Sequence, residues 1–331
     1  MKRFVQTVIV LLALQIMFPL VTIQAKVVTV DGMKYVIFKG HAVLAECLKE
    51  DVRDLVIPET VSIDSVTYPI TSIGGIIAFG HNSSDFMASP FVHCTNLVSV
   101  KVPNSVTCIG VKCFVNCDNL TTVELPNSVT LSWNCFFGCK KLQKIIIPPE
   151  AVVDFRAPFY DCHIDTVEFS SGRDSIDGAQ YFEECTVGTI IVPSTIRWIH
   201  WHWLHRMQDL GNLFIPCITP PVFDLNKPIY RYNTTPWEDM YWGVRDANII
   251  VPDEAVEAYR SDWSWKHFEH IYSYTDLITS MSHLQTDPPS QQSLPQGLYD
   301  LSGRRLSVPS TSSVLPKGVY IENGKKRVRI R

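Results

Sequence analysis

The feature that most constrains the fold of this chain is a repeat of 22 or 23 residues. Each repeat carries a phenylalanine followed three residues later by a cysteine, and both columns advance by 23, 22, 23 and 23 residues. A fixed period of this length is typical of a solenoid, because each repeat buries its apolar face only by stacking on its neighbours. The two columns are Phe91, Phe114, Phe136, Phe159 and Phe182, and Cys94, Cys117, Cys139, Cys162 and Cys185.

Each repeat also contains a short apolar strand, usually followed by proline, which has no amide hydrogen for a sheet ladder. Leu120, Val123 and Leu125 have the L-x-x-L-x-L spacing that turns three side chains inward and leaves Thr122 and Glu124 outward. We therefore predict a β-rich leucine-rich-repeat solenoid with a parallel, concave sheet. Its strands are expected at residues 97–102, 120–125, 142–147, 164–169, 187–192 and 210–215.

Composition divides the chain into six segments. Residues 1–25 have the basic start, apolar centre and small final residue of a signal peptide. Residues 26–57 are expected to form an N-terminal β cap, residues 58–218 the repeats, and residues 219–278 a C-terminal cap that includes a last strand and a short helix. Residues 279–295 are Ser-, Gln- and Pro-rich, as in a linker, and residues 296–331 predict a small β unit with a hairpin turn at Asn323-Gly324.

Charge and hydropathy restrict the expected cellular location of the protein and the class of partner that it binds. The net charge of −4 does not suggest a nucleic-acid partner. Residues 296–331 carry eight basic and two acidic side chains, so this tail is basic while the remainder of the chain is acidic. After the signal peptide no stretch reaches transmembrane length, and we predict that the mature chain is exported, without membrane insertion, to the cell surface or the medium.

The ten cysteines are predicted to be free and buried rather than paired. Neighbouring coils stack about 4.8 Å apart, and parallel Cβ vectors at that spacing exceed the ~3.8 Å mean of a disulfide. Cys113 and Cys135 follow the same argument, whereas Cys47, Cys108 and Cys217 fall outside the columns and have no assigned role.

Metal ligation is considered for His200, His202 and His205, the densest histidine cluster, because three imidazoles can hold zinc or copper. Their register with Gly110 and Lys112 instead predicts a solvated surface turn. We therefore predict neither a metal nor a cofactor. Five nearby tryptophans either build an end cap or form a sugar- or protein-binding patch: Trp198, Trp201, Trp203, Trp237 and Trp242.

Outward strand positions supply a candidate binding surface. Its charged and hydroxyl-rich part lies in the first coils, and its apolar part lies in the last two. The alternative is that residues 223–245 of the chain itself cover the apolar part. The candidate residues are Lys101, Glu124, Lys144, Ile146, Glu168, Ile191, Asn212 and Phe214.

Catalytic motifs are absent from the sequence: it has no G-x-S-x-G, no phosphate-binding loop and no H-E-x-x-H. No catalytic residue is assigned, and the chain is not predicted to be an enzyme. Two alternatives to binding stay open. One is a glycan-acting enzyme that uses acids such as Glu124 and Glu168, and the other is a purely structural component of the cell surface.

The repeat N-S-V-T-x-I-G-x-x-x-F-x-x-C-x-x-L resembles the BspA-like leucine-rich repeat family of bacterial surface proteins, over about residues 35–275. Residues 299–305 and 317–326 are similar to short C-terminal domains of exported Bacteroidota proteins, which resemble type IX secretion sorting tails. The resemblance implies adhesion without enzyme activity. The implied partners are host matrix proteins, other cell surfaces or glycans. It leaves open the ligand, the face that binds it, cleavage of the tail and the oligomeric state.

Overall fold

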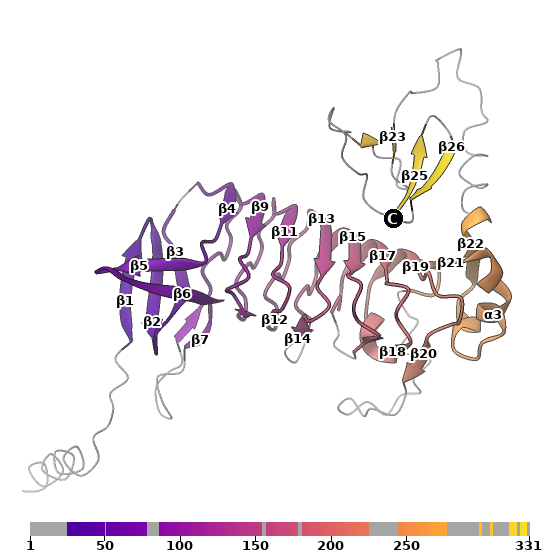
Figure 1. The fold of residues 1–331 in the computed structure, drawn as a ribbon, viewed down its shortest axis with the longest axis horizontal. Coiled ribbons are helices and arrows are strands. Elements are labelled where there is room, and N and C mark those ends of the chain that lie inside the picture. Colours follow the sequence, from indigo (N-terminus) through magenta and orange to yellow (C-terminus); the bar gives the residue numbers. More distant parts are fainter. Residues whose placement is uncertain are drawn as a thin grey trace, which may run out of the picture. The chain divides into compact units, whose positions relative to one another are not determined.

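The computed structural model describes residues 25–49, 51–77, 86–153, 157–177, 181–224 and 244–276, and the tail strands at 298–299, 305–306, 318–322 and 325–329. The chain divides into two compact units, Met1–Leu277 and Ile278–Arg331, and each is considered by itself. The first unit is a stack of short coils, with strands along two of its sides (Figure 1). No helix among the described residues is long and apolar enough to cross a membrane.

A nine-stranded parallel sheet runs along one side of the solenoid, in the order β22-β21-β19-β17-β15-β13-β11-β9-β4. Strands from successive coils pair in register, as Ser99 with Thr122 and Thr122 with Lys144. This confirms the predicted repeat solenoid with parallel strands. The strands are β4 (Asp54–Val56), β9 (Ser99–Lys101), β11 (Thr122–Glu124), β13 (Leu142–Ile147), β15 (His163–Phe169), β17 (Thr186–Ile191), β19 (Asp209–Phe214), β21 (Asn248–Val251) and β22 (His270–Ser273).

The second side of the solenoid begins in the N-terminal segment. Antiparallel β1 (Lys26–Val30), β2 (Met33–Phe38) and β3 (His41–Cys47) lead into β6 (Val66–Ile73), which also pairs with β5 (Thr60–Ile63). Parallel pairing continues from β6 through β10 (Cys108–Ile109) and β12 (Thr130–Leu131) to β14 (Val152–Val153). The segment predicted as a cap thus extends this side, while β4 within it starts the nine-stranded sheet.

Two smaller sheets complete the described strands of the first unit. β16 (Ser175–Ile176), β18 (Trp198–His200) and β20 (Val222–Asp224) form a parallel sheet that continues the second side in later coils. β7 (Gly75–Ile77) and β8 (Phe86–Ala88) form an antiparallel pair. Among the described strands, no pairing joins β14 to β16, so the second side is interrupted between the fourth and fifth coils.

The phenylalanine column forms the centre of the core. Consecutive rings stack with centroids 4.9, 5.1, 5.2 and 5.8 Å apart, and the angle between ring planes grows from 3° to 17° along the column. All five rings are buried. Since the ring spacing is close to the spacing of paired strands, one aromatic ring per coil fills the space between the two sides.

A sharp turn follows each phenylalanine and requires left-handed backbone. The residue before each position of the cysteine column has a positive φ, between 54° and 72°, in six successive coils. Asn and Gly tolerate this conformation well, but a longer side chain adopts it at a cost. The six residues are His93, Asn116, Gly138, Asp161, Glu184 and Arg206.

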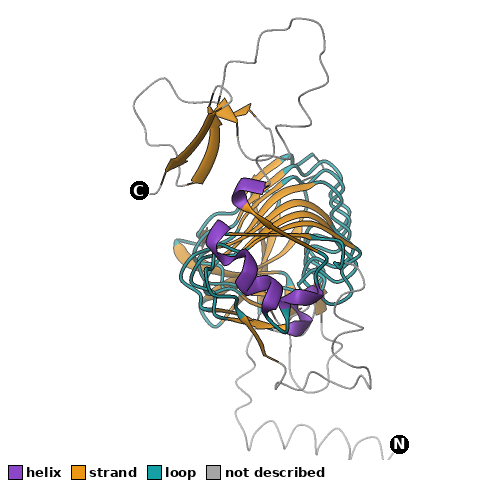
Figure 2. Cartoon of the chain, turned by 90° about the vertical axis from the view of Figure 1, so that its right-hand side faces the viewer, coloured by secondary structure: helices purple, strands orange, loops and turns teal. Residues whose placement is uncertain are grey.

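Short helices close the C-terminal end of the solenoid, which faces the viewer in Figure 2. They are the 3₁₀ helices Asp253–Ala255 and Trp265–His267 and the α-helix α3 (Val256–Ser261). The buried Trp265 donates its indole N–H to the Pro221 carbonyl at 2.8 Å, and the Tyr259 hydroxyl donates to the Cys217 carbonyl at 3.1 Å. These bonds attach the cap to the last coil.

The second unit contains a four-stranded antiparallel sheet, in the order β24-β23-β25-β26. Its strands are β23 (Leu298–Tyr299), β24 (Arg305–Leu306), β25 (Gly318–Glu322) and β26 (Lys325–Arg329). β25 and β26 pair along their whole length on either side of the predicted Asn323-Gly324 turn.

Candidate binding surface

Two columns of side chains lie on the outer face of the nine-stranded sheet. The polar column runs through Asp54, Ser99, Thr122, Lys144, Thr166, Thr189, Asn212, Asn248 and His270. The outer column runs through Val56, Lys101, Glu124, Ile146, Glu168, Ile191, Phe214, Ile250 and Tyr272. Every predicted surface residue lies in one of these columns. Sequence reasoning missed the members in β4, β21 and β22, because insertions there break the period.

Ion pairs join the charged residues of neighbouring coils. Lys101 Nζ lies 2.9 Å from Glu124 Oε2 in the outer column, and Lys144 Nζ of the polar column lies 2.6 Å from Glu168 Oε2. These side chains are exposed or half-buried, so each pair contributes less than about 1 kcal/mol to stability. Their main effect is to neutralise the charged part of the surface.

Hydrogen bonds run along the polar column. Ser99 donates to Asp54 Oδ1 at 2.6 Å, Asn212 donates to Thr189 Oγ1 at 3.4 Å, and Asn248 donates to Asn212 Oδ1 at 3.1 Å. Hydrogen-bonded polar side chains therefore lie beside the outer column at both ends of the sheet.

The outer column becomes apolar toward the C-terminal end of the sheet. Ile146 is 44% exposed, Ile191 and Phe214 are half-buried, and Tyr272 is 37% exposed. Ile250, which pairs with Phe214 on one side and Tyr272 on the other, is fully buried. Within residues 223–245, positions 225–243 lie outside the described residues, so covering of the apolar part by this segment stays a prediction.

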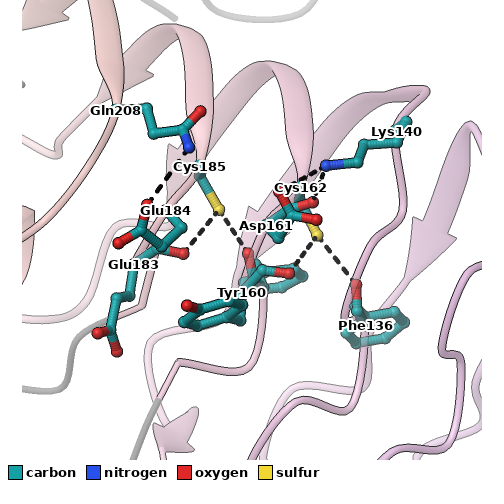
Figure 3. Close-up of polar contacts among 10 residues, drawn as sticks. Phe136, Lys140, Tyr160, Asp161, Cys162, Glu183, Glu184, Cys185 and Gln208 are labelled. Atoms are coloured by element: carbon teal, nitrogen blue, oxygen red, sulfur yellow. Dashed lines mark hydrogen bonds and ion pairs between the residues drawn. The ribbon is translucent and has the colours of Figure 1, made fainter.

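The cysteine column is hydrogen-bonded to the phenylalanine column. The thiol of Cys117 donates to the Phe91 carbonyl of the preceding coil at 3.1 Å, and Cys162 donates to the Phe136 carbonyl at 2.9 Å. Cys185 makes the same bond to the Phe159 carbonyl (Figure 3). All ten cysteines, each in a described segment, are free. Burial raises the pKa of Cys162 well above its ordinary value, which keeps the thiol protonated and able to donate.

A second charged row, missed by sequence reasoning, lies at the left-handed turns (Figure 3). Lys140 Nζ lies 2.6 Å from Asp161 Oδ1, and Arg206 lies 2.9 Å from Glu183 Oε1 and 2.8 Å from Glu184 Oε1. For Glu184 and Arg206 the signal in the sequence is the position directly before the cysteine column, because these two residues stack at one coil spacing and carry opposite charges. Lys140 directly follows Cys139, so its pair with Asp161 has no such signal.

Six copies of the family model described as "BspA type Leucine rich repeat region" match the chain, over residues 59–186 and 156–219. These coils are BspA type leucine-rich repeats. The match covers the repeats from β5 to the coil of β19 and excludes the tail strands.

Solved structures similar to this chain are also leucine-rich repeat proteins. One from Bacteroides capillosus is 28% identical, covers 39% of this chain and 87% of its own, and has a TM-score of 0.33. One from Bacteroides ovatus is 14% identical, covers 74% and 76%, and has a TM-score of 0.30. A leucine-rich cell surface protein from Faecalibacterium prausnitzii is 14% identical, covers 76% and 95%, and has a TM-score of 0.23. No curated protein matches the chain.

The histidine cluster occupies a BspA type coil that departs from the repeat. His200 ends β18, and His205 follows the 3₁₀ helix Trp201–Leu204; both histidines are buried. The predicted solvated turn is therefore wrong for these two residues, because the 3₁₀ helix replaces the open turn of earlier coils. The side chain of His202 lies outside the described residues. Among the described residues, no group of three His, Cys, Asp or Glu side chains could hold a metal ion.

The tryptophans divide between the core and the surface of the repeats. Trp203 is 1% exposed and lies in the core, as a cap residue would, whereas Trp198 on β18 is 52% exposed. The side chains of Trp201, Trp237 and Trp242 lie outside the described residues. Of the off-column cysteines, Cys217 is buried with its thiol 3.5 Å from the Ile196 carbonyl, and Cys47 and Cys108 are half-buried.

Proposed function

We propose that this protein is an exported bacterial surface protein that binds a protein ligand on the outer face of its nine-stranded sheet. The observation that carries the proposal is the change along the outer column. Its first coils are charged and ion-paired, and its last coils present Ile191, Phe214 and Tyr272 beside a stripe of Thr and Asn side chains. An apolar centre beside polar groups that form hydrogen bonds is the usual anatomy of a protein interface.

The positions of the two acids considered for catalysis favour a binding surface over a glycan-hydrolysing site. A glycan hydrolase needs two carboxylates placed on either side of the scissile bond. Here Glu124 and Glu168 lie on the sheet face, and each is paired with a lysine.

The proposed location rests on the two terminal segments of the chain. In this proposal residues 1–25 direct export, and the basic tail at 296–331 acts as a type IX sorting domain that delivers the solenoid to the cell surface or the medium. The expected partners are therefore host matrix proteins or proteins on another cell, with a glycan as the alternative ligand and no nucleic acid.

The test is a binding assay with the chain that lacks residues 1–25. We would immobilise it and measure binding of purified host matrix proteins, and in parallel binding to a glycan array. Saturable binding of a matrix protein that weakens when Phe214 is replaced supports the proposal. Binding to glycans alone would move the ligand class to sugars. Binding to neither, with the protein fixed in the cell envelope, would favour a structural role.

A further inference from the structure

The first strand of the nine-stranded sheet, β4, has a neighbour on one side only. It pairs with β9, and no other described strand pairs with it (Figure 1). The Arg53 carbonyl accepts hydrogen bonds from the Val98 and Ser99 amides, and the Ile57 amide donates to the Lys101 carbonyl. β4 is therefore an edge strand, paired with β9 along one edge and with no described strand along the other.

The backbone groups of Asp54 and Val56 point away from β9. In a parallel ladder the N–H and C=O of one residue face the same side, and successive residues alternate between the two sides. Because Arg53 and Ile57 bond to β9, the residues between them that face the free edge are Asp54 and Val56. Within the described part of the chain, the N–H and C=O groups of these two residues have no hydrogen-bond partner.

The last strand of the sheet, β22, is treated differently. Arg260 Nη2 donates to the Ile271 carbonyl at 3.0 Å, and Asp276 Oδ2 accepts from the Ser273 amide at 3.0 Å. Charged side chains thus bond to backbone groups of β22. An unpaired strand edge is a template for pairing with another chain, and proteins usually cover or block it. The chain blocks β22 in this way and leaves β4 open.

A groove of about 500 Å³ runs along β4 and is lined by Lys49 and residues 51–56. The lining comes wholly from the strand and the residues directly before it, so no other segment of the chain forms an opposite wall. Val56 is 69% exposed, the highest value among the large hydrophobic side chains of the described residues. The edge of β4 is therefore accessible to another chain.

The outward side chains of β4 indicate what a paired strand would carry. Asp54 Oδ1 accepts a hydrogen bond from Ser99 at 2.6 Å, while Asp54 Oδ2 has no partner among the described residues. Directly opposite side chains in a sheet stabilise the pair when a donor meets a carboxylate or an apolar group meets an apolar group. A donor is therefore favoured beside Asp54, and an apolar side chain beside Val56. Lys144 and Ile146 of β13 already have this spacing in the same two columns.

We propose that the free edge of β4 binds an extended segment of the protein ligand as an additional strand of the sheet. The segment carries Lys, Arg, Ser or Thr beside Asp54 and an apolar residue beside Val56, with one residue between them. This inference rests on the proposed function for the class of ligand, and it adds how part of that ligand is recognised. Because β4 is only three residues long, the pairing is weak alone, and the rest of the ligand is held on the adjoining sheet face.

The test is an NMR titration of the isotope-labelled chain that lacks residues 1–25, followed through the amide signals of Asp54 and Val56. The probe is the synthetic peptide acetyl-Thr-Lys-Thr-Val-Thr-Lys-Thr-amide, whose symmetric sequence offers the required side chains in a parallel or an antiparallel pair. We expect saturable shifts of these two amides. Glutamate in place of both lysines of the peptide should weaken binding about two- to tenfold, and Asp54→Asn should remove that preference.

N-methylated forms of the peptide are the matched controls, because methylation removes an amide hydrogen and leaves every side chain unchanged. In a parallel pair the threonine amides face β4, and in an antiparallel pair the lysine and valine amides face it. We expect methylation of one of these two sets to abolish binding and methylation of the other set to retain it.

Three results would overturn the proposal. They are the absence of saturable shifts at Asp54 and Val56, an equal effect of the two methylated sets, and shifts that grow with protein concentration alone. The last result would assign the edge to a second copy of the chain. The proposed function is judged separately, by matrix-protein binding that depends on Phe214, so either proposal can fail without the other.

Discussion

The thiol of Cys139 lies 3.2 Å from the carbonyl oxygen of Phe114, one coil earlier, and donates a hydrogen bond to it. The same bond recurs from Cys117, Cys162 and Cys185. Cysteine in this column is therefore more than a small apolar filler, because it supplies a donor to a buried carbonyl of the preceding coil. This explains why the column holds cysteine rather than alanine or valine.

Replacing Cys139 tests the value of this donor. Cys139→Ser keeps a hydrogen-bond donor near the Phe114 carbonyl and should lower the free energy of unfolding by about 1 kcal/mol. Cys139→Ala removes the donor and leaves a small cavity, and should cost about 2 kcal/mol. Urea unfolding followed by circular dichroism measures both. If serine proves as costly as alanine, the column needs sulfur for its volume alone.

Stability should fall at alkaline pH. Burial, with smaller effects of Cys117 and Cys47, raises the pKa of Cys94 from 9.0 to about 11. Because the folded state holds this proton more tightly than the unfolded chain, the contribution is complete below about pH 9 and is lost as the pH rises toward 11. Urea midpoints measured from pH 7 to 11 should be level and then decline. Cys94→Ser should decline less, and a level curve to pH 11 would contradict the assignment.

The left-handed turns predict substitutions of opposite sign in one column. Gly138 has φ of 72°, and a Cβ there would lie 2.2 Å from Asn116 Oδ1, so Gly138→Ala should cost about 1–2 kcal/mol. His93 has φ of 57° in the equivalent turn, and His93→Gly should gain up to about 1 kcal/mol. Thermal unfolding of the two variants measures the signs. Equal signs would show that backbone conformation does not govern this position.

The period predicts the fold because stacking leaves little freedom. The phenylalanine and cysteine columns set the register of the coils. The strand predicted at residues 142–147 has the bounds of β13, and the other five predicted strands needed changes of only one or two residues at their ends. The prediction of sheet membership failed where the period is broken. Nothing in residues 26–57 marked β4 as the first strand of that sheet, since its partner β9 lies 45 residues later.

Side-chain interactions between coils were harder to predict. Lys144 and Glu168 were both placed outward, but their ion pair joins the two columns diagonally, and this depends on side-chain reach rather than on strand register. His200 and His205 were misplaced because the 3₁₀ helix at Trp201–Leu204 has no counterpart in earlier coils. Aligned repeats predict the features that all coils share. An ion pair or a helix that occurs in one coil alone cannot be predicted from them.

Removing the second unit should separate folding from delivery. A chain ending at Leu277 keeps every described contact of the solenoid unit, so its Tm should stay close to that of the full chain. In a Bacteroidota host the truncated protein should accumulate in the periplasm, as judged by fractionation and surface protease digestion. Normal surface exposure of the truncated protein would reject the sorting role of the tail.

The apolar part of the outer column predicts where a protein ligand binds. Phe214→Ala should weaken binding of the ligand by more than about 1 kcal/mol, as truncation of an anchor residue does. Thr122→Ala, in the polar column of the second repeat, is the matched control and should change affinity little. Equal and negligible effects in folded variants would place the ligand elsewhere on the repeats.

The bond from each cysteine to the preceding phenylalanine carbonyl also bears on how such a chain can lengthen. Every coil of the column presents a thiol toward one neighbour and a carbonyl toward the other. A duplicated stretch of one full period in the gene would therefore encode a coil that finds its bonding partners on both sides. An insertion of one or two codons would move the thiol away from its carbonyl. Duplication of whole repeats, through unequal recombination, is therefore the change in length that disturbs this fold least.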